Sequence, residues 1–398
     1  MALLTMEEKA APAVDGWAPF ALGFRPFFLG AGFAAVLLMA LWLFWLRGSL
    51  AMPAWHHAPV LWHAHEMLFG FGAAVIAGFL LTAVHNWTGL ATPQWVPLAL
   101  LFGLWLLGRA AFLIPGLPAG VVLVLDLAFL PAVAAAVASP ILRARQARNY
   151  AFPVILGALT VAAALVDAQM LGYTQATANA GVMLGVYLIV LMMVVMGGRV
   201  IPFFTDARVG GHARRWTPVE WLAPVSVAAV AGGMLASPQS VFTITAAALA
   251  TGLHLVRLLG WQRRALWKVP LLWVLHAGYA WIVLGFLLTA LAGAGLLPVS
   301  LALHAYTVGA IGGLTLGMMA RVSLGHTGRP LAPAKIMTLA FLCINAAALL
   351  RVIVPLLWPV WYGAALVAGG LAWVLAFGVF FATYLPILLR PRVDGKPG

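Results

Sequence analysis

Residues 62–84 read WHAHEMLFGFGAAVIAGFLLTAV, an apolar run that opens with two histidines and a glutamate. A helix rises about 1.5 Å per residue, so about twenty such residues cross the hydrocarbon core of a bilayer. Similar runs recur along the 398-residue chain, which is 64% hydrophobic and 8% charged. The pattern predicts an all-α polytopic membrane protein, because a transmembrane β-barrel would show alternating segments of about ten residues.

Hydropathy predicts about twelve transmembrane helices with short connections. They form a single membrane domain, residues 27–388, between a cytoplasmic N-terminal segment, 1–26, and a cytoplasmic tail, 389–398. The expected spans are 27–47, 62–84, 94–114, 119–139, 151–171, 179–198, 219–236, 241–257, 269–292, 300–321, 334–354 and 360–388.

Positive charge sets the expected orientation. If both termini are cytoplasmic, only Arg47, Arg109 and Arg351 of the 22 lysines and arginines lie toward the outer side, as the positive-inside rule requires. That rule also explains the formal charge of +13, so we expect the lipid bilayer, and no nucleic acid, as the partner of these charges.

The single cysteine, Cys343, excludes intrachain disulfides, cysteine-ligated iron–sulfur clusters and covalent c-type haem.

Three histidines fall at one depth near the outer surface. His63 and His65 begin the second span, and His304 begins the tenth. A b-type haem bound by two imidazoles takes one from each of two helices. Because residues i and i+2 point about 200° apart on a helix, only one of His63 and His65 can face a central iron. We favour His65, which has Phe69 and Gly72 below it; the other could bind a second metal, a propionate or a carboxylate. A lone histidine in a membrane helix is otherwise a hydrogen-bonded packing residue.

Charged side chains lie at the same outer level. Arg109 and Asp126 have similar depths in the third and fourth spans, and we expect an ion pair because neither charge is stable alone in a membrane. Arg109, Arg351 and Arg47 are also at the level of the candidate haem, where cations pair with propionates. Glu66 could accept the free N–H of a ligand imidazole, relay protons, or lie in interfacial water.

A second group of polar residues lies on the expected inner side. The stretches GRVIPFFT (198–205) and ARVSLGHTGRP (320–330) follow the sixth and tenth spans. Their side chains could converge on a second metal site, a proton entry or a gas-channel mouth, although the positive-inside rule alone explains arginines here. In the tenth span, Gly309, Gly313 and Gly317 form a stripe typical of close helix packing. The inner candidates are Arg199, Arg321, His326, His276 and Tyr279.

The stretches WHAHEMLFGF, AGFLLTAVHNWTG, GRVIPFFT and HAYTVGAIGGLTLGMMARVSLGHTGRPL resemble the signature motifs of the NnrS family of bacterial inner-membrane proteins. The resemblance implies haem b and copper as cofactors, and a role in nitric oxide metabolism or resistance to nitrosative stress in denitrifying and related bacteria. It also implies nitric oxide or an NO-derived molecule as ligand; the electron donor stays unidentified. The family usually has proline where this chain has His85. By matching motif, the implied functional residues are His63, His65, Glu66, Arg199, Arg321 and His326, with His304 opening the tenth-span motif.

The architecture is also similar to subunit I of haem–copper oxidases, which has haem-ligating histidines on spans two and ten. Those enzymes take copper ligands from spans six and seven, where this chain has no histidine. Copper ligands would therefore come from His56, His57 and His63 outside, or from His276 and His326 inside. The sequence leaves open whether the protein is an enzyme. The alternative functions are a membrane transporter of a metal or NO-derived complex, and an assembly partner of a respiratory complex.

Overall fold

The computed structural model describes residues 16–49 and 59–396, and every regular element in this part of the chain is helical. His56 and His57, with most of the expected N-terminal segment, lie outside the described residues. The first half contains α1 (Phe24–Leu46), α2 (Pro59–His65), η1 (Glu66–Gly72), α3 (Ala73–Thr88), α4 (Trp95–Ala111), α5 (Ala119–Leu127), α6 (Phe129–Arg143), η2 (Ala147–Asn149), α7 (Ala151–Met170) and α8 (Ala178–Val209).

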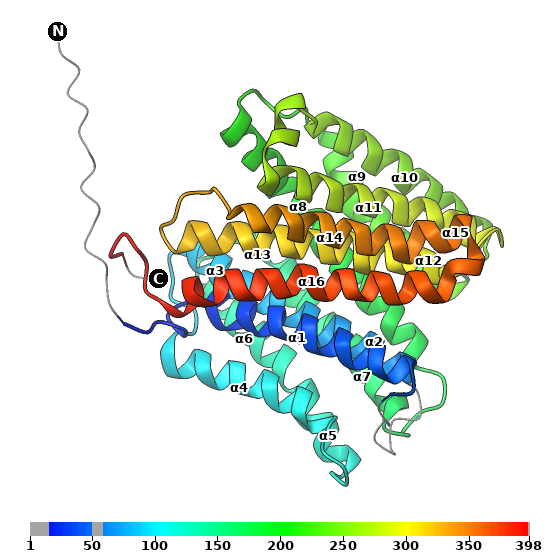
Figure 1. The fold of residues 1–398 in the computed structure, drawn as a ribbon, viewed down its shortest axis with the longest axis horizontal. Helices are drawn as coiled ribbons and strands as arrows, with labels where there is room; N and C mark the ends of the chain where they lie inside the picture. The colour runs from blue at the N-terminus through cyan, green and yellow to red at the C-terminus, as the bar shows by residue number, and fades with distance from the viewer. Residues whose placement is uncertain (1–15, 50–58, 397–398) are drawn as a thin grey trace.

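The second half continues the bundle without an inserted domain (Figure 1). Together the described residues contain eleven helices long and apolar enough to cross a membrane, plus the shorter apolar α4. The predicted all-α polytopic membrane fold is therefore confirmed. The elements are α9 (Thr217–Ala236), α10 (Val241–Trp261), η3 (Arg264–Lys268), α11 (Pro270–Gly293), α12 (Val299–His304), η4 (Ala305–Gly312), α13 (Gly313–His326), α14 (Lys335–Ala348), η5 (Leu349–Ile353), α15 (Val354–Leu357), η6 (Pro359–Trp361) and α16 (Tyr362–Leu389).

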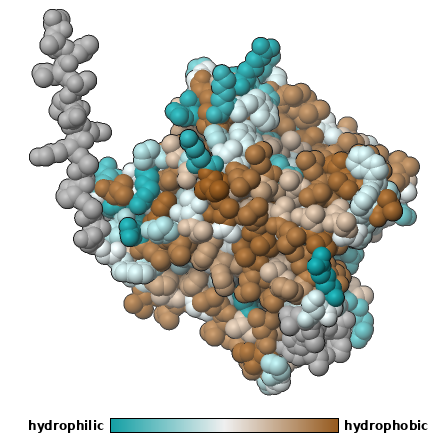
Figure 2. All heavy atoms as spheres, in the orientation of Figure 1, coloured by the Kyte–Doolittle hydropathy of each residue, from teal (hydrophilic) through white to brown (hydrophobic). Residues whose placement is uncertain are grey.

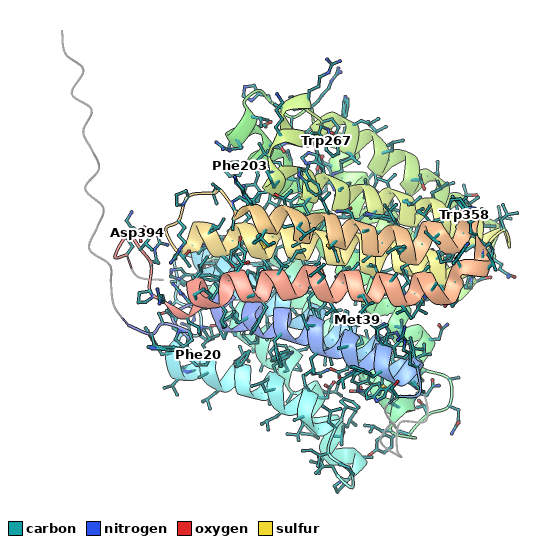
Figure 3. All side chains as sticks on the ribbon, viewed as in Figure 1. Phe20, Met39, Phe203, Trp267, Trp358 and Asp394 are labelled. Atoms are coloured by element: carbon teal, nitrogen blue, oxygen red, sulfur yellow. The ribbon has the colours of Figure 1, made fainter. Side chains whose placement is uncertain are left out.

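The two ends of the described chain meet on one face of the bundle. The Ala18 amide donates a hydrogen bond to the Leu389 carbonyl (2.9 Å), and Arg25 Nη1 donates to the Leu388 carbonyl (3.0 Å). We call this end the terminal face and the opposite end the far face; Asp394 and Trp358 mark them in Figure 3. An even number of crossings places both termini on one side. The charge pattern predicts that the terminal face is cytoplasmic.

The surface matches a chain solvated by lipid. Figure 2 shows hydrophobic residues along the lengths of the helices and hydrophilic residues mainly toward the ends of the bundle. Large apolar side chains such as Leu100, Val154 and Leu249 are 69–70% exposed. In a membrane these side chains contact acyl chains, so their exposure carries no hydrophobic penalty.

Three spans contain π-helical segments, which hydropathy does not predict. These are η1 in the second span, η4 in the tenth and η5 in the eleventh. The first two follow directly after His65 and His304, and η5 contains Arg351. A π turn inserts an extra residue into a helix and is frequent at functional sites. The outer positions selected from sequence thus coincide with the places where the helices change their winding.

The glycine stripe of the tenth span packs against α11. A Cβ on Gly309 would overlap the Trp281 indole, and one on Gly317 would lie 2.8 Å from Val274 Cγ1. At Gly313 the nearest atom to a Cβ is the Cα of Gly278, at an ordinary 3.4 Å. The expected close helix packing is confirmed. Gly309 and Gly317 leave no room for a side chain, whereas Gly313 would accept a methyl group.

We predict that Gly309→Ala lowers the free energy of unfolding by about 1–3 kcal/mol, because the added methyl group overpacks against Trp281. Gly313→Ala is the matched control, with a change close to zero or slightly stabilising, since alanine favours helix. Thermal unfolding in detergent measures both. Equal stability of the two variants would contradict the packing assigned to the stripe.

Candidate functional site

A cluster of ionisable side chains lies inside the bundle toward the far face. His65 and Asp167 are fully buried, Glu66 is 1% exposed and Asp126 5% exposed. The Arg109 side chain, on α4, is 12% exposed. The contributing elements are α2, η1, α4, α5 and α7. We call these five side chains the His65 cluster.

Both ring nitrogens of His65 face carboxylates. Nδ1 lies 3.2 Å from Glu66 Oε1. Nε2 lies 3.2 Å from Asp126 Oδ2 and 3.0 Å from Asp167 Oδ1. A neutral imidazole has one N–H and one lone pair. One nitrogen would then point a lone pair at carboxylate oxygens unless His65 is an imidazolium or a cation lies between them.

Arg109 supplies the positive charge within the cluster. Its Nη1 donates to Glu66 Oε1 (2.6 Å), and its Nη2 donates to Asp126 Oδ1. The ion pair between Arg109 and Asp126 expected from their depths is therefore confirmed. Two glycines make room for it: a Cβ on Gly70 would lie 2.8 Å from Glu66 Oε2, and one on Gly108 would lie 3.1 Å from the Cα of Asp126.

The His65 cluster has an excess of negative charge. Glu66, Asp126 and Asp167 are three of the nine acidic residues in the chain, and Arg109 offsets one of them. Asp167 Oδ2 and Glu66 Oε2 have no hydrogen-bond donor, and Asp167 Oδ1 faces His65 Nε2 at 3.0 Å. Because buried carboxylates are stable only when paired, the cluster requires a further cation or protons.

A second group of side chains lies on the far face around His63 and His304. The His63 ring stacks on Trp42, with ring centroids 4.5 Å apart. His63 Nδ1 and Arg351 Nη1 are buried and have no hydrogen-bond partner. His304 Nδ1 donates to the Ser300 carbonyl (2.6 Å), which leaves Nε2 with its lone pair. His63, His304 and Arg351 lie close enough for their charges to interact. Of the two motif histidines, His63 is therefore grouped with His304, whereas His65 belongs to the carboxylates.

The inner candidates bind several different neighbours. Arg199 donates to Asn149 Oδ1 (2.8 Å) and the Arg148 carbonyl (2.9 Å). The Arg321 guanidinium lies 3.7 Å from the centre of the Phe204 ring, so the tenth-span motif does touch the PFFT stretch.

The remaining candidate residues also lie apart from one another, each with its own neighbours. His326 packs beside Phe24, with ring centroids 5.7 Å apart. His276 Nδ1 donates to the Leu272 carbonyl, while its buried Nε2 has no partner. At the outer end, Arg47 is exposed at the C-terminus of α1.

Tyr279 belongs to a buried network that sequence reasoning did not assemble. Arg257 Nη1 donates to Tyr279 Oη (2.9 Å), and Arg257 Nη2 donates to Glu220 Oε2 (2.5 Å). Tyr279 Oη is 2.7 Å from His254 Nδ1, and His254 Nε2 is 3.2 Å from Ser226 Oγ. The network links α9, α10 and α11, and each of its five side chains has a partner within it.

Asp167 is the other residue that sequence reasoning missed. It is a lone acid near the outer end of the expected fifth span, at a depth similar to Asp126 and Arg109. Intramembrane acids are rare and face partners inside the bundle. The same depth argument that paired Arg109 with Asp126 could have added Asp167.

Comparison with known protein families finds a match to a family model described as NnrS protein, over residues 18–392. The match covers nearly the whole chain, including both the His65 cluster and the His63–His304 group. Comparison with curated proteins finds no match.

We predict that Arg109→Met destabilises the protein by about 3–5 kcal/mol, because it leaves buried carboxylates without their counter-charge. Adding Asp126→Asn should recover part of this loss, since it removes one of those charges. The exposed Arg47→Met is the control and should change little. The measurement is the free energy of unfolding in detergent. An Arg109→Met variant as stable as Arg47→Met would show that the ion pairs of Arg109 do not contribute to the stability of the fold.

Proposed function

The chain belongs to the NnrS family, and from this membership and the far-face geometry we propose that it is a b-type haem protein of the bacterial inner membrane. Its proposed role is in nitric oxide metabolism or resistance to nitrosative stress. The haem would bind near the far face, which the charge pattern predicts to be periplasmic.

The unpartnered atoms on the far face support this proposal. His63 Nδ1 is buried without a hydrogen bond, and His304 keeps the lone pair of Nε2 because its Nδ1 donates to Ser300. Two helices thus each offer one neutral imidazole nitrogen, the donor set of a bis-histidine haem. These two nitrogens suit the axial positions of a haem iron, and we assign His63 and His304 as the haem ligands.

His63 replaces His65 as the favoured ligand of the second span. Both nitrogens of His65 lie within 3.2 Å of carboxylate oxygens, which occupy the space that a haem would need beside either nitrogen. His63 has no such competitor. Its ring is held by stacking on Trp42, which fixes the plane of the imidazole.

The surrounding residues would position the haem and balance its charge. Arg351 Nη1 is buried and unpaired, and Arg351 is close enough to both histidines for its charge to act on them, so it would pair with a propionate. The Ser300 carbonyl holds His304 in one tautomer, as partners of ligand histidines do. When bound, the haem would supply an iron that exchanges one electron, and it would bind nitric oxide in place of one of the two histidines.

An apolar cavity supports a small uncharged ligand. It has a volume of about 90 Å³ and lies between α1, α3, α8, α11 and α13. Phe79, Met192, Met196, Leu314 and Met318 are among its lining residues. One water molecule needs about 10–15 Å³ of such a cavity, so a diatomic gas fits.

Copper is the second proposed cofactor. Imidazole is a common copper ligand, and His276 Nε2 is buried toward the terminal face without a hydrogen-bond partner. His276 is therefore our proposed copper ligand. His326 remains an additional candidate from its motif.

We predict that the purified protein shows a reduced-minus-oxidised b-type haem spectrum, and that His63→Ala and His304→Ala each lower haem content at least about tenfold. His254→Ala, which also removes a buried imidazole, should keep the haem. Loss of haem in His65→Ala with retention in His63→Ala would move the ligand to His65. Retention in all of these variants would reject a haem at this face.

A further inference from the structure

The His65 cluster contains three ligand atoms that converge on one point. His65 Nε2, one oxygen of Asp126 and one of Asp167 all lie within 4.8 Å of one another. His65 Nε2 lies 3.2 Å from Asp126 Oδ2 and 3.0 Å from Asp167 Oδ1, and the three groups come from three helices. All three residues are buried, so bulk water does not fill the space between them.

These separations match the spacing of ligands around one ion. An ion bonded at about 2.1 Å separates neighbouring ligand atoms by about 3.0 Å at right angles and about 3.4 Å at tetrahedral angles. The distances from His65 Nε2 fall in this range. The three side chains therefore need only small movements to take a shared cation.

The neighbouring residues orient the ligands as in known metal sites. With its proton on Nδ1, His65 donates to Glu66 Oε1 (3.2 Å) and turns the Nε2 lone pair toward the two aspartates. A carboxylate behind a ligand histidine is the usual arrangement in metalloproteins. Arg109 in turn binds Glu66 Oε1 and Asp126 Oδ1, which leaves Asp126 Oδ2 for the ion.

The charge of the cluster also calls for a divalent ion. With neutral His65, the three carboxylates and Arg109 sum to −2, which one divalent cation neutralises. Asp167 is fully buried, its Oδ2 has no hydrogen-bond donor, and its Oδ1 faces the Nε2 lone pair of neutral His65 at 3.0 Å. Such a carboxylate is strongly destabilising unless a cation binds it.

We propose that His65, Asp126 and Asp167 bind a divalent metal ion of the manganese, iron or zinc class. Two carboxylates and one imidazole suit these ions, whereas cuprous copper prefers sulfur ligands. Three protein ligands leave at least one coordination position for water or another small ligand. The site is distinct from the haem proposed at His63 and His304, and it does not depend on that proposal.

The test is a titration of the full-length protein in detergent after chelator treatment. Mn²⁺ is the probe, and free Mn²⁺ is followed by its electron paramagnetic resonance signal, with Zn²⁺ as competitor. We expect one Mn²⁺ per wild-type chain, displaced by Zn²⁺. Asp167→Asn should weaken binding by at least about 100-fold, because it removes a ligand and a charge. Glu220→Gln, which alters the carboxylate paired with Arg257, is the matched control and should bind as wild type.

Thermal unfolding gives a second, independent measurement. Metal-free Asp167→Asn should unfold at a higher temperature than metal-free wild type, because it no longer buries an unpaired charge. Mn²⁺ should stabilise wild type and leave the variant unchanged, while the haem spectrum is the same in both. Equal Mn²⁺ affinity in wild type and Asp167→Asn, or no binding of Mn²⁺ and Zn²⁺ to wild type, would overturn the site. His65 would then be an imidazolium between two carboxylates.

Discussion

The structure depends on how a bundle with few charged residues, 8% of the chain, compensates the charges that it buries. Three of the nine acidic residues of the chain converge on His65, and Arg109 bridges two of them. Each such charge would be strongly destabilising alone in a membrane. The attraction of Arg109 for Glu66 and Asp126 therefore fixes η1, α4 and α5 relative to one another near the far face. The packing of the spans and the chemistry of the site follow from one electrostatic requirement.

The backbone adapts to this requirement at particular positions. The π-helical segments η1, η4 and η5 all lie in the far half of their spans, next to His65, next to His304 and around Arg351. Glycines at 70 and 108 leave space for the Arg109 side chain and for the approach of α5. π-Helical turns and glycines thus occur where polar groups have to meet inside the bundle.

Hydropathy and charge were sufficient to predict the fold, because crossing a bilayer imposes a length and a composition that can be read locally. The same depth reasoning correctly paired Arg109 with Asp126. It could not separate His63 from His65, because the direction of a side chain depends on local winding, and the π turns that follow His65 leave no trace in hydropathy. It also missed Asp167, although the depth of this residue matches that of Asp126, and it did not pair Glu220 with Arg257, which lie on different helices. For the inner motifs the sequence left two interpretations open, a convergent cluster or arginines placed by the positive-inside rule alone. In the structure Arg199, Arg321 and His326 each have separate neighbours.

The central claim is that the haem iron and the divalent metal ion both bind near the far face. Anomalous X-ray diffraction from crystals of the protein isolated with its cofactors tests it most directly, because each metal is located by its own absorption edge. The account predicts an iron peak between His63 and His304, and a separate divalent-metal peak beside His65 Nε2, Asp126 and Asp167. Iron on the terminal face, bound at His276 or His326 with no metal at the far face, would contradict it.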